Sequence, residues 1–272
     1  MNEQVSLAGV PETMLWTLHN RASEALRDDA RLSDPEAVRI YQSIDYDFER
    51  SFGRPDGSHA ERSRIFDAAV RPWMAAHPGG TVVELGCGLE TQFHRCDDGK
   101  VRWICVDVPE AIEVRERFLS ASDRCRHVAR SALDPAWMDE VDSDAPVFVT
   151  AQGLLMYFEA SQVCSLITTI MDRFDDVELM FDAIPRWFSR KTLRGMNKTR
   201  HYQTPPMPWG INRDEIVDTL RRWSPRIASV DFVDFDRFRG VMGFIFPKVF
   251  KLPMLARWAP SVVRVRSVGA TK

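Results

Sequence analysis

The residues with the clearest chemical signature are two glycines that follow a short run typical of a buried strand. Residues 81–85 read Thr-Val-Val-Glu-Leu, and Gly86 and Gly88 come directly after them. Asp107 lies about 20 residues beyond this turn, the usual place for a carboxylate that binds a ribose diol. A backbone without side chains also lets a ligand come close. We therefore expect a cofactor that contains adenosine.

Two kinds of cofactor fit this loop. The dinucleotide fingerprint G-x-G-x-x-G requires a third glycine, and Thr91 stands at that position. Glu84, two residues before Gly86, is typical of the methyltransferase version of the loop. The residues therefore favour S-adenosylmethionine, and an NAD-dependent oxidoreductase is the alternative.

S-adenosylmethionine presents a carboxylate, an ammonium group, two ribose hydroxyls and an adenine ring. An ionised Asp107 accepts two hydrogen bonds at once, which suits the hydroxyls, and we place Val108 beside it in the same site. The methionyl carboxylate matches a guanidinium fork, for which Arg62 and Arg64 are the candidates.

Several segments resemble the leucine carboxyl methyltransferase family, and most closely its bacterial branch of polyketide-type O-methyltransferases. These segments are residues 85–93 (LGCGLETQF), 101–103 (VRW), 107–110 (DVPE), 153–157 (GLLMY), 12–15 (ETML), 45–48 (DYDF) and 209–211 (WGI). The resemblance covers most of the chain. It implies the class I S-adenosylmethionine-dependent methyltransferase fold, an α/β doubly wound and mostly parallel sheet. It does not identify the methyl acceptor.

The resemblance also implies roles for single residues. Arg62 matches the family's carboxylate-binding arginine better than Arg64 does. The family places an acid and an apolar residue against adenine after the third strand. Here that segment is Ser131, Ala132 and Leu133, with Ser131 at the acid position.

The fourth expected strand ends at Gln152 and Gly153, where relatives commonly carry Glu before the glycine. An amide still offers a carbonyl oxygen to the cofactor's ammonium group, but without a charge. We therefore expect both residues to bind the cofactor. A non-catalytic protein that binds S-adenosylmethionine is a second alternative.

Methyl transfer is an in-line displacement, so the protein mainly aligns the acceptor with the methyl group and excludes water. A carboxylate, with a pKa of about 4, needs no base, whereas a phenol, at about 10, usually does. No Ser-His-Asp or Cys-His pattern stands out. We expect an O-methyltransferase that acts on a carboxylate or hydroxyl of a small, polyketide-like metabolite. Tyr157, His201 and Tyr202 are the catalytic candidates.

The elements that position these residues alternate between strand and helix. Expected strands are Thr81–Leu85, 101–106, Cys125–Ala129, 146–151 and 177–181, and expected helices between them are 109–119 and 160–174. This alternation predicts a parallel sheet with ligands at the carboxyl ends of its strands.

The rest of the chain divides around this core, which spans residues 78–184. Residues 1–77 read as an amino-terminal helical cap, and residues 185–212 as a lid or insertion. Residues 213–272 are expected to supply a helix near 212–222, two last strands at 227–235 and 241–246, and a basic tail. The resemblance implies that these two strands form an antiparallel pair.

Charge, cysteine content and the length of apolar runs argue against several classes of protein. A net charge of −3 gives no electrostatic reason to bind nucleic acid. Five cysteines without a C-x-x-C pair, and a polar start, predict a reducing cytoplasm. No run is long enough for stable membrane insertion. No metal-ligand spacing is evident. A homo-oligomer is left open.

Overall fold

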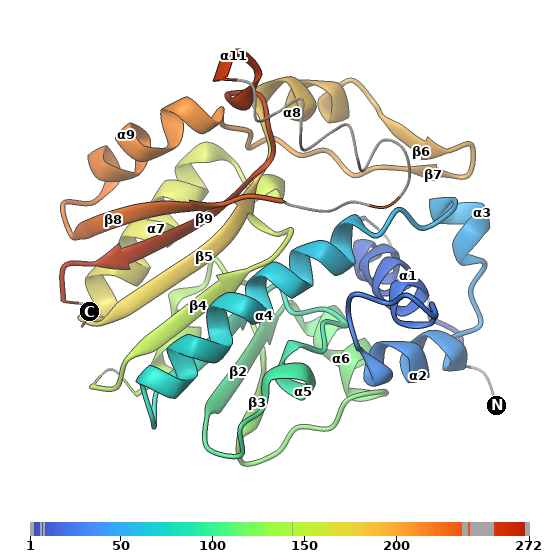
Figure 1. Cartoon of the computed structure of the whole chain (residues 1–272), viewed down its shortest axis with the longest axis horizontal. Helices are drawn as coiled ribbons and strands as arrows, with labels where there is room; N and C mark the ends of the chain where they lie inside the picture. Colours follow the sequence, from blue (N-terminus) through green and yellow to red (C-terminus); the bar gives the residue numbers. More distant parts are fainter. Residues whose placement is uncertain are drawn as a thin grey trace.

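The structure, a computed structural model, describes residues 3–5, 7, 9–142, 144–235, 239 and 253–269. Within these residues, one seven-stranded sheet runs through the molecule (Figure 1). Its strands are β1 (Thr81–Leu85), β2 (Arg102–Asp107), β3 (Cys125–Ala129), β4 (Val147–Ala151), β5 (Val177–Ala183), β8 (Ile227–Val233) and β9 (Ser261–Ser267).

The strand order is β3-β2-β1-β4-β5-β9-β8, and β1 to β5 are parallel. Every residue of β1, β4 and β5 is buried, as expected of parallel strands covered on both faces. The order reverses between β1 and β4, which is where ligands bind in such sheets. The predicted α/β doubly wound fold is therefore confirmed.

The last strand differs from the sequence-based prediction. β8 does pair with an antiparallel neighbour, but that neighbour is β9, in the stretch expected to be a basic tail. β9 also pairs with β5, so it lies inside the sheet with Val262, Val263 and Val265 fully buried. Its arginines are compatible with this position because Arg264 pairs with the buried Glu178. Residues 241–246 lie outside the described residues.

Helices cover both faces of the sheet. α7 (Ala160–Arg173), α9 (Arg213–Trp223) and the 3-10 turn η1 (Pro135–Glu140) pack on one face. α4 (Ser58–Ala76) packs on the other face, together with α5 (Gln92–Cys96). α6 (Pro109–Glu116) follows β2, and the 3-10 turn η2 (Leu155–Tyr157) follows β4.

The amino-terminal helices gather at one side of the sheet (Figure 1). They are α1 (Thr13–Ala25), α2 (Pro35–Ser43) and α3 (Phe48–Phe52). Asp34 begins α2 as its N-cap, because its side chain accepts from the Ala37 N–H at 3.0 Å, and Pro35 follows at the first helical position.

Residues 185–212 form a short helix, α8 (Arg186–Leu193), and a small hairpin, β6 (Asn197–Thr199) with β7 (Tyr202–Gln203). A further turn of helix, α11 (Pro253–Ala256), precedes β9. In Figure 1 the hairpin lies at the upper right, next to α3, and α8 lies along the top of the view.

A network of buried charges joins the helical cap to the loop after β1. The guanidinium of Arg21 lies 2.9 Å from Asp34 and 3.1 Å from Glu90. The guanidinium of Arg95 contacts Asp34, Glu90 and Asp67, each within 2.8 Å. Burial alone raises the pKa of Glu90, but the two guanidiniums outweigh it and lower this pKa.

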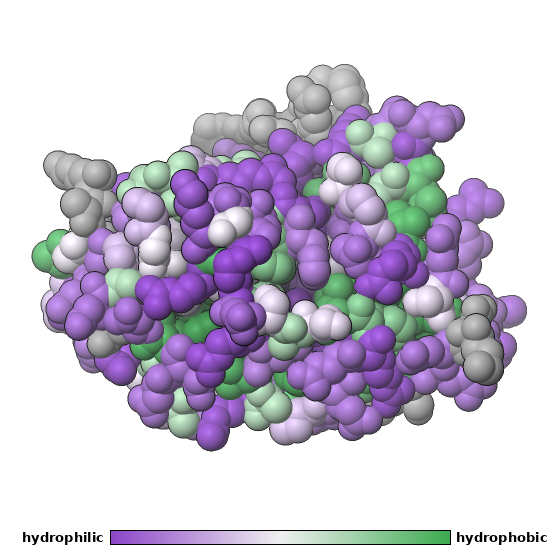
Figure 2. All heavy atoms as spheres, turned by 90° about the horizontal axis from the view of Figure 1, so that it is seen from below, coloured by the Kyte–Doolittle hydropathy of each residue, from purple (hydrophilic) through white to green (hydrophobic). Residues whose placement is uncertain are grey.

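On the face shown in Figure 2, hydrophilic residues cover most of the surface, and hydrophobic residues appear in patches between them. Among the described residues, none of the helices has the length and apolar character needed to cross a bilayer.

The charge network generates the first prediction. Glu90→Gln removes one buried carboxylate and should lower the free energy of unfolding by about 3 kcal/mol, since a broken buried pair leaves uncompensated charge. Because the pKa of Glu90 is lowered, this stabilisation is present above about pH 4 and is lost as the pH falls further. Urea unfolding at several pH values measures both effects.

The matched control is Glu113→Gln, which breaks the exposed pair with Arg117. It should cost less than about 1 kcal/mol. Equal losses in the two variants would contradict a structural role for the buried network.

Candidate active site

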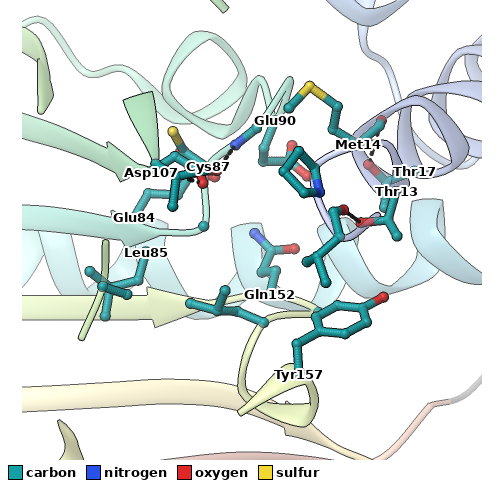
Figure 3. A pocket seen from close by; sticks show the side chains of 18 of the residues that line it. Thr13, Met14, Thr17, Glu84, Leu85, Cys87, Glu90, Asp107, Gln152 and Tyr157 are labelled. Carbon is teal, nitrogen blue, oxygen red and sulfur yellow. Dashed lines mark hydrogen bonds between the residues drawn. The ribbon is translucent and has the colours of Figure 1, made fainter. Parts of the chain in front are cut away.

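A cavity of about 260 Å³ lies at the carboxyl ends of β1 to β4, under the first turns of α1. Figure 3 shows α1 on one side of it and the loops after β1 and β2 on the other. The structure brings most of the predicted site residues to this cavity. They are Arg62, Glu84, Gly86, Gly88, Asp107, Val108, Ser131, Ala132, Gln152, Gly153 and Tyr157.

The loop after β1 requires both glycines. Gly86 has a φ of +66° and Gly88 of +41°, a region that side chains rarely adopt. A Cβ on Gly86 would lie 2.8 Å from Leu154 Cδ1, and one on Gly88 would lie 2.9 Å from Met14 Cβ. The backbone is thus packed closely from two sides while it borders the cavity.

Asp107 is held in place at the end of β2. One carboxylate oxygen accepts from the Gly88 N–H at 2.8 Å, and the other accepts from the Val108 N–H at 2.8 Å. Burial raises the pKa of Asp107, and these two bonds oppose the shift. Each carboxylate oxygen keeps lone-pair capacity for a ligand hydroxyl, which fits the ribose diol of the expected cofactor.

Arg62 reaches the cavity from α4. Its Nη1 lies 3.1 Å from Asp182 on β5, and its buried Nε has no hydrogen-bond partner among the described residues. The guanidinium lies over Gly153, where a Cβ would come within 2.6 Å of Nη1. Arg64 instead pairs with Glu61 and does not line the cavity.

Gln152 places an amide at the floor of the cavity. Its Nε2 donates to Gln92 Oε1 at 3.2 Å, while its own Oε1 is buried without a partner among the described residues. Such an atom is costly to bury unless something binds it. A carbonyl oxygen in this position suits the cofactor's ammonium group.

Glu84 has a different role from the other loop residues. Its side chain turns toward β2, where it accepts from Trp103 Nε1 at 3.4 Å and lies 3.7 Å from the Cys105 sulfur. Burial raises the pKa of Glu84 well above its usual range. The side chain therefore supports the loop from below as a neutral acid.

The segment after β3 enters the cavity only in part. Ser131 and Ala132 line it, whereas Leu133 borders a separate cavity of about 300 Å³ with Met138 and Leu166. The Ser131 hydroxyl accepts from the Leu133 N–H at 3.2 Å. The Leu133 side chain packs against the hydrophobic cluster that includes Leu166 of α7, and it does not line the cofactor cavity.

A second cavity, of about 990 Å³, adjoins the first. Its walls come from α1, α4, α8 and the segment leading into the hairpin. The two cavities share Thr13, Thr17, Arg62, Gly153 and Tyr157. Of the three catalytic candidates, only Tyr157 lies where the two meet. Burial raises the pKa of Tyr157 to about 12, so its hydroxyl stays protonated at neutral pH.

The structure does not bring His201 and Tyr202 to either cavity. His201 is exposed in the turn of the hairpin beside Arg200. The ring of Tyr202 is buried against Trp16 and Phe52.

The residues of α1 that cover the cofactor cavity were not among the site residues predicted from the sequence. These are Thr13, Met14 and Thr17, with Val10 and Pro11 just before the helix. The segment 12–15, already noted for its resemblance, was the available signal. His59 and Trp16 in the larger cavity, for which no local motif exists, were not predicted as site residues either.

Three side chains with metal-binding chemistry meet beneath the loop, which the sequence spacing did not predict. The ligand atoms of Cys105, Cys125 and His127 lie within 4.8 Å of one another. The buried guanidinium of Arg115 already places a cation among them, 3.3 Å from the Cys105 sulfur and 3.1 Å from His127 Nε2. It also donates to the backbone oxygens of Gly88 and Glu90, so this cluster holds the cofactor loop.

Comparison with known proteins agrees with this geometry. The model of the family described as leucine carboxyl methyltransferase matches residues 16–171. The tetracenomycin polyketide synthesis O-methyltransferase TcmP of Streptomyces glaucescens is 33% identical over 193 residues, which cover 70% of this chain and 72% of that protein. The S-adenosyl-L-methionine-dependent methyltransferase dpfgK of Gibberella zeae is 30% identical over 203 residues, covering 66% and 68%.

Among solved structures, a putative methyltransferase from Thermobifida fusca YX superimposes with a TM-score of 0.53 at 14% identity, covering 92% of this chain and 94% of that one. This likeness shows the fold alone. The match to a methyltransferase family decides the cofactor in favour of S-adenosylmethionine and against the NAD-dependent alternative.

The site generates a prediction for the ribose contact. Asp107→Ala should weaken binding of S-adenosylhomocysteine by about 1.5–3 kcal/mol, the scale of a hydrogen bond to a charged group. Because the ionised form binds and its pKa is raised, wild-type affinity should fall as the pH is lowered, and the variant should lose this dependence. Calorimetry measures both, with the exposed Glu113→Ala as control. Unchanged affinity in a folded Asp107→Ala protein would refute the assignment.

A second prediction concerns the two arginines of α4. Arg62→Ala should raise the dissociation constant for S-adenosylhomocysteine much more than Arg64→Ala does, because only Arg62 lines the cavity. Arg62→Lys should rescue binding only in part, since lysine lacks the planar fork. Titration calorimetry on the three variants tests this, and equal effects at the two positions would overturn the choice of Arg62.

Proposed function

The chain belongs to the leucine carboxyl methyltransferase family and is an S-adenosylmethionine-dependent methyltransferase, and from this premise we propose that it methylates a carboxylate oxygen of a small, anionic, ring-bearing metabolite. The observation that carries the proposal is the larger cavity, which opens onto the cofactor cavity at Arg62 and Tyr157. We assign this cavity to the acceptor, with α8 and the hairpin as its lid.

The charges around the larger cavity favour an anion. Asp182 and Asp56 also line it, but each is paired, with Arg62 at 3.1 Å and with Lys198 at 3.6 Å respectively. The three further cations of the lining make no ion pair with the described part of the chain. They are Arg190, Lys191 and Arg194 on and just after α8. An anionic group entering here would meet a positive rim.

The apolar lining of the larger cavity favours a methyl acceptor that contains a ring. Trp16, Tyr157 and Phe188 border the cavity, together with Trp187, whose side chain is partly exposed. Flat aromatic surfaces bury well against such groups. The relative TcmP is described as an enzyme of polyketide synthesis, which agrees with a polyketide-like acceptor for this chain.

The chemistry also favours a carboxylate. Bound S-adenosylmethionine supplies the methyl group from its sulfonium. An acceptor carboxylate is ionised at neutral pH, with a pKa of about 4, so no side chain has to remove a proton. The residues then have to hold the acceptor in line and keep water out. We assign Tyr157, whose hydroxyl stays protonated, to orient the acceptor where the two cavities meet.

The proposal is tested by the product. Radiolabelled methyl transferred to an aromatic acid should be released as methanol by mild alkali, because esters are cleaved and ethers are not. Turnover should change little between about pH 6 and 8 on account of the acceptor, whose pKa lies near 4. Label that survives alkali would contradict ester formation and indicate a hydroxyl acceptor, leaving the methyltransferase assignment in place.

A further inference from the structure

His59 lies on α4, one turn before Arg62, and lines the larger cavity. The edge of its ring packs against Trp16, with ring centroids 5.3 Å apart and planes at 69°. Its Nδ1 is buried without a hydrogen-bond partner among the residues that the structure describes. Polar atoms in such positions are usually paired, so a missing partner calls for an explanation.

The charges around His59 keep its ring neutral. Burial lowers the pKa of His59 to about 3, and the nearby guanidinium of Arg62 and ammonium of Lys198 act in the same direction. Asp56 opposes them. The ammonium group of Lys198 also lies over the Trp16 ring, 4.8 Å from its centroid. At neutral pH the imidazole therefore has one N–H to donate and one lone pair to offer.

The neutral ring and low pKa of His59 argue against a role as a general base and favour a role as a hydrogen-bond donor to an anion. Burial lowers the pKa of His59, which makes its ring a weak acceptor for the proton of a phenol, whose own pKa is about 10. His59 is therefore unsuited to act as a general base. A neutral N–H beside two cations is instead well suited to bind one oxygen of an anionic group.

We propose that His59 is a specificity-determining residue that donates a hydrogen bond to the acceptor's carboxylate, on the oxygen that does not receive the methyl group. This inference rests on the proposed function, because it assumes that the larger cavity takes the acceptor. Binding one oxygen in this way leaves the other free to face the cofactor cavity beyond Arg62 and Tyr157.

The test uses binding, so it does not depend on turnover. The protein is saturated with S-adenosylhomocysteine and titrated with 2-naphthoate, and separately with methyl 2-naphthoate, which has the same ring without the charge. Wild type should prefer the acid. His59→Phe keeps a ring against Trp16 but has no donor, and it should weaken 2-naphthoate binding about tenfold or more. The ester should lose less affinity, because its carbonyl oxygen accepts only a neutral hydrogen bond from His59. His59→Gln keeps an N–H and should recover part of the loss.

Two controls distinguish a failure of the role assigned to His59 from a failure of the proposed function. The affinity of His59→Phe for S-adenosylhomocysteine should match wild type within about twofold, which shows that Arg62 and the fold are undisturbed. If wild type prefers the acid and His59→Phe keeps the full preference, the role of His59 is wrong while the proposed function stands. If wild type binds the acid no better than the ester, the anionic acceptor itself fails, and the inference about His59 fails with it.

Discussion

The buried ion pairs of Arg21 and Arg95 with Asp34, Asp67 and Glu90 are the interaction on which the cofactor site depends. These groups come from α1, α2, α4, α5 and the loop after β1, so they join the helical cap to the parallel sheet. Burying so much charge is costly unless every member is paired. Loss of any one ion pair would therefore leave a buried charge without a partner and destabilise the network. It keeps α1 over the glycine loop, and α1 forms one wall of the cofactor cavity.

The sheet supplies the second constraint. Parallel strands bring their carboxyl ends to one edge, and the reversal of strand order between β1 and β4 opens a space there. The loops after four neighbouring strands then converge on one cavity, held from below by Glu84 and Arg115. α4 adds the larger cavity, because a single helical face presents His59 to it and, one turn later, Arg62 to both. Helical spacing thus couples the site for the cofactor to the site proposed for the acceptor.

Local signals were sufficient for the centre of the fold and for the cofactor. Strands β1 and β3 begin and end where the sequence predicts, because short runs of apolar residues between turns are typical of buried parallel strands. Gly86, Gly88 and Asp107 could be found because their function depends on residue type and short spacing. The packing of Leu133 is an example that these local signals did not predict. Its side chain packs against the hydrophobic cluster that includes Leu166 of α7, and no pattern in the sequence indicates that packing.

The amino-acid sequence by itself determined the α/β class, the glycine loop, the acid proposed to bind ribose and the family resemblance, since each depends on residue types and their spacing along the chain. Only the tertiary structure decided which distant residues share a cavity. It placed β9 inside the sheet, because long-range burial of Val262, Val263 and Val265 and the pairing of Arg264 with Glu178 outweigh the basic character of that stretch. It brought His59 and Trp16 into the larger cavity and kept His201 and Tyr202 out, because side-chain direction depends on packing between elements that lie far apart in the chain.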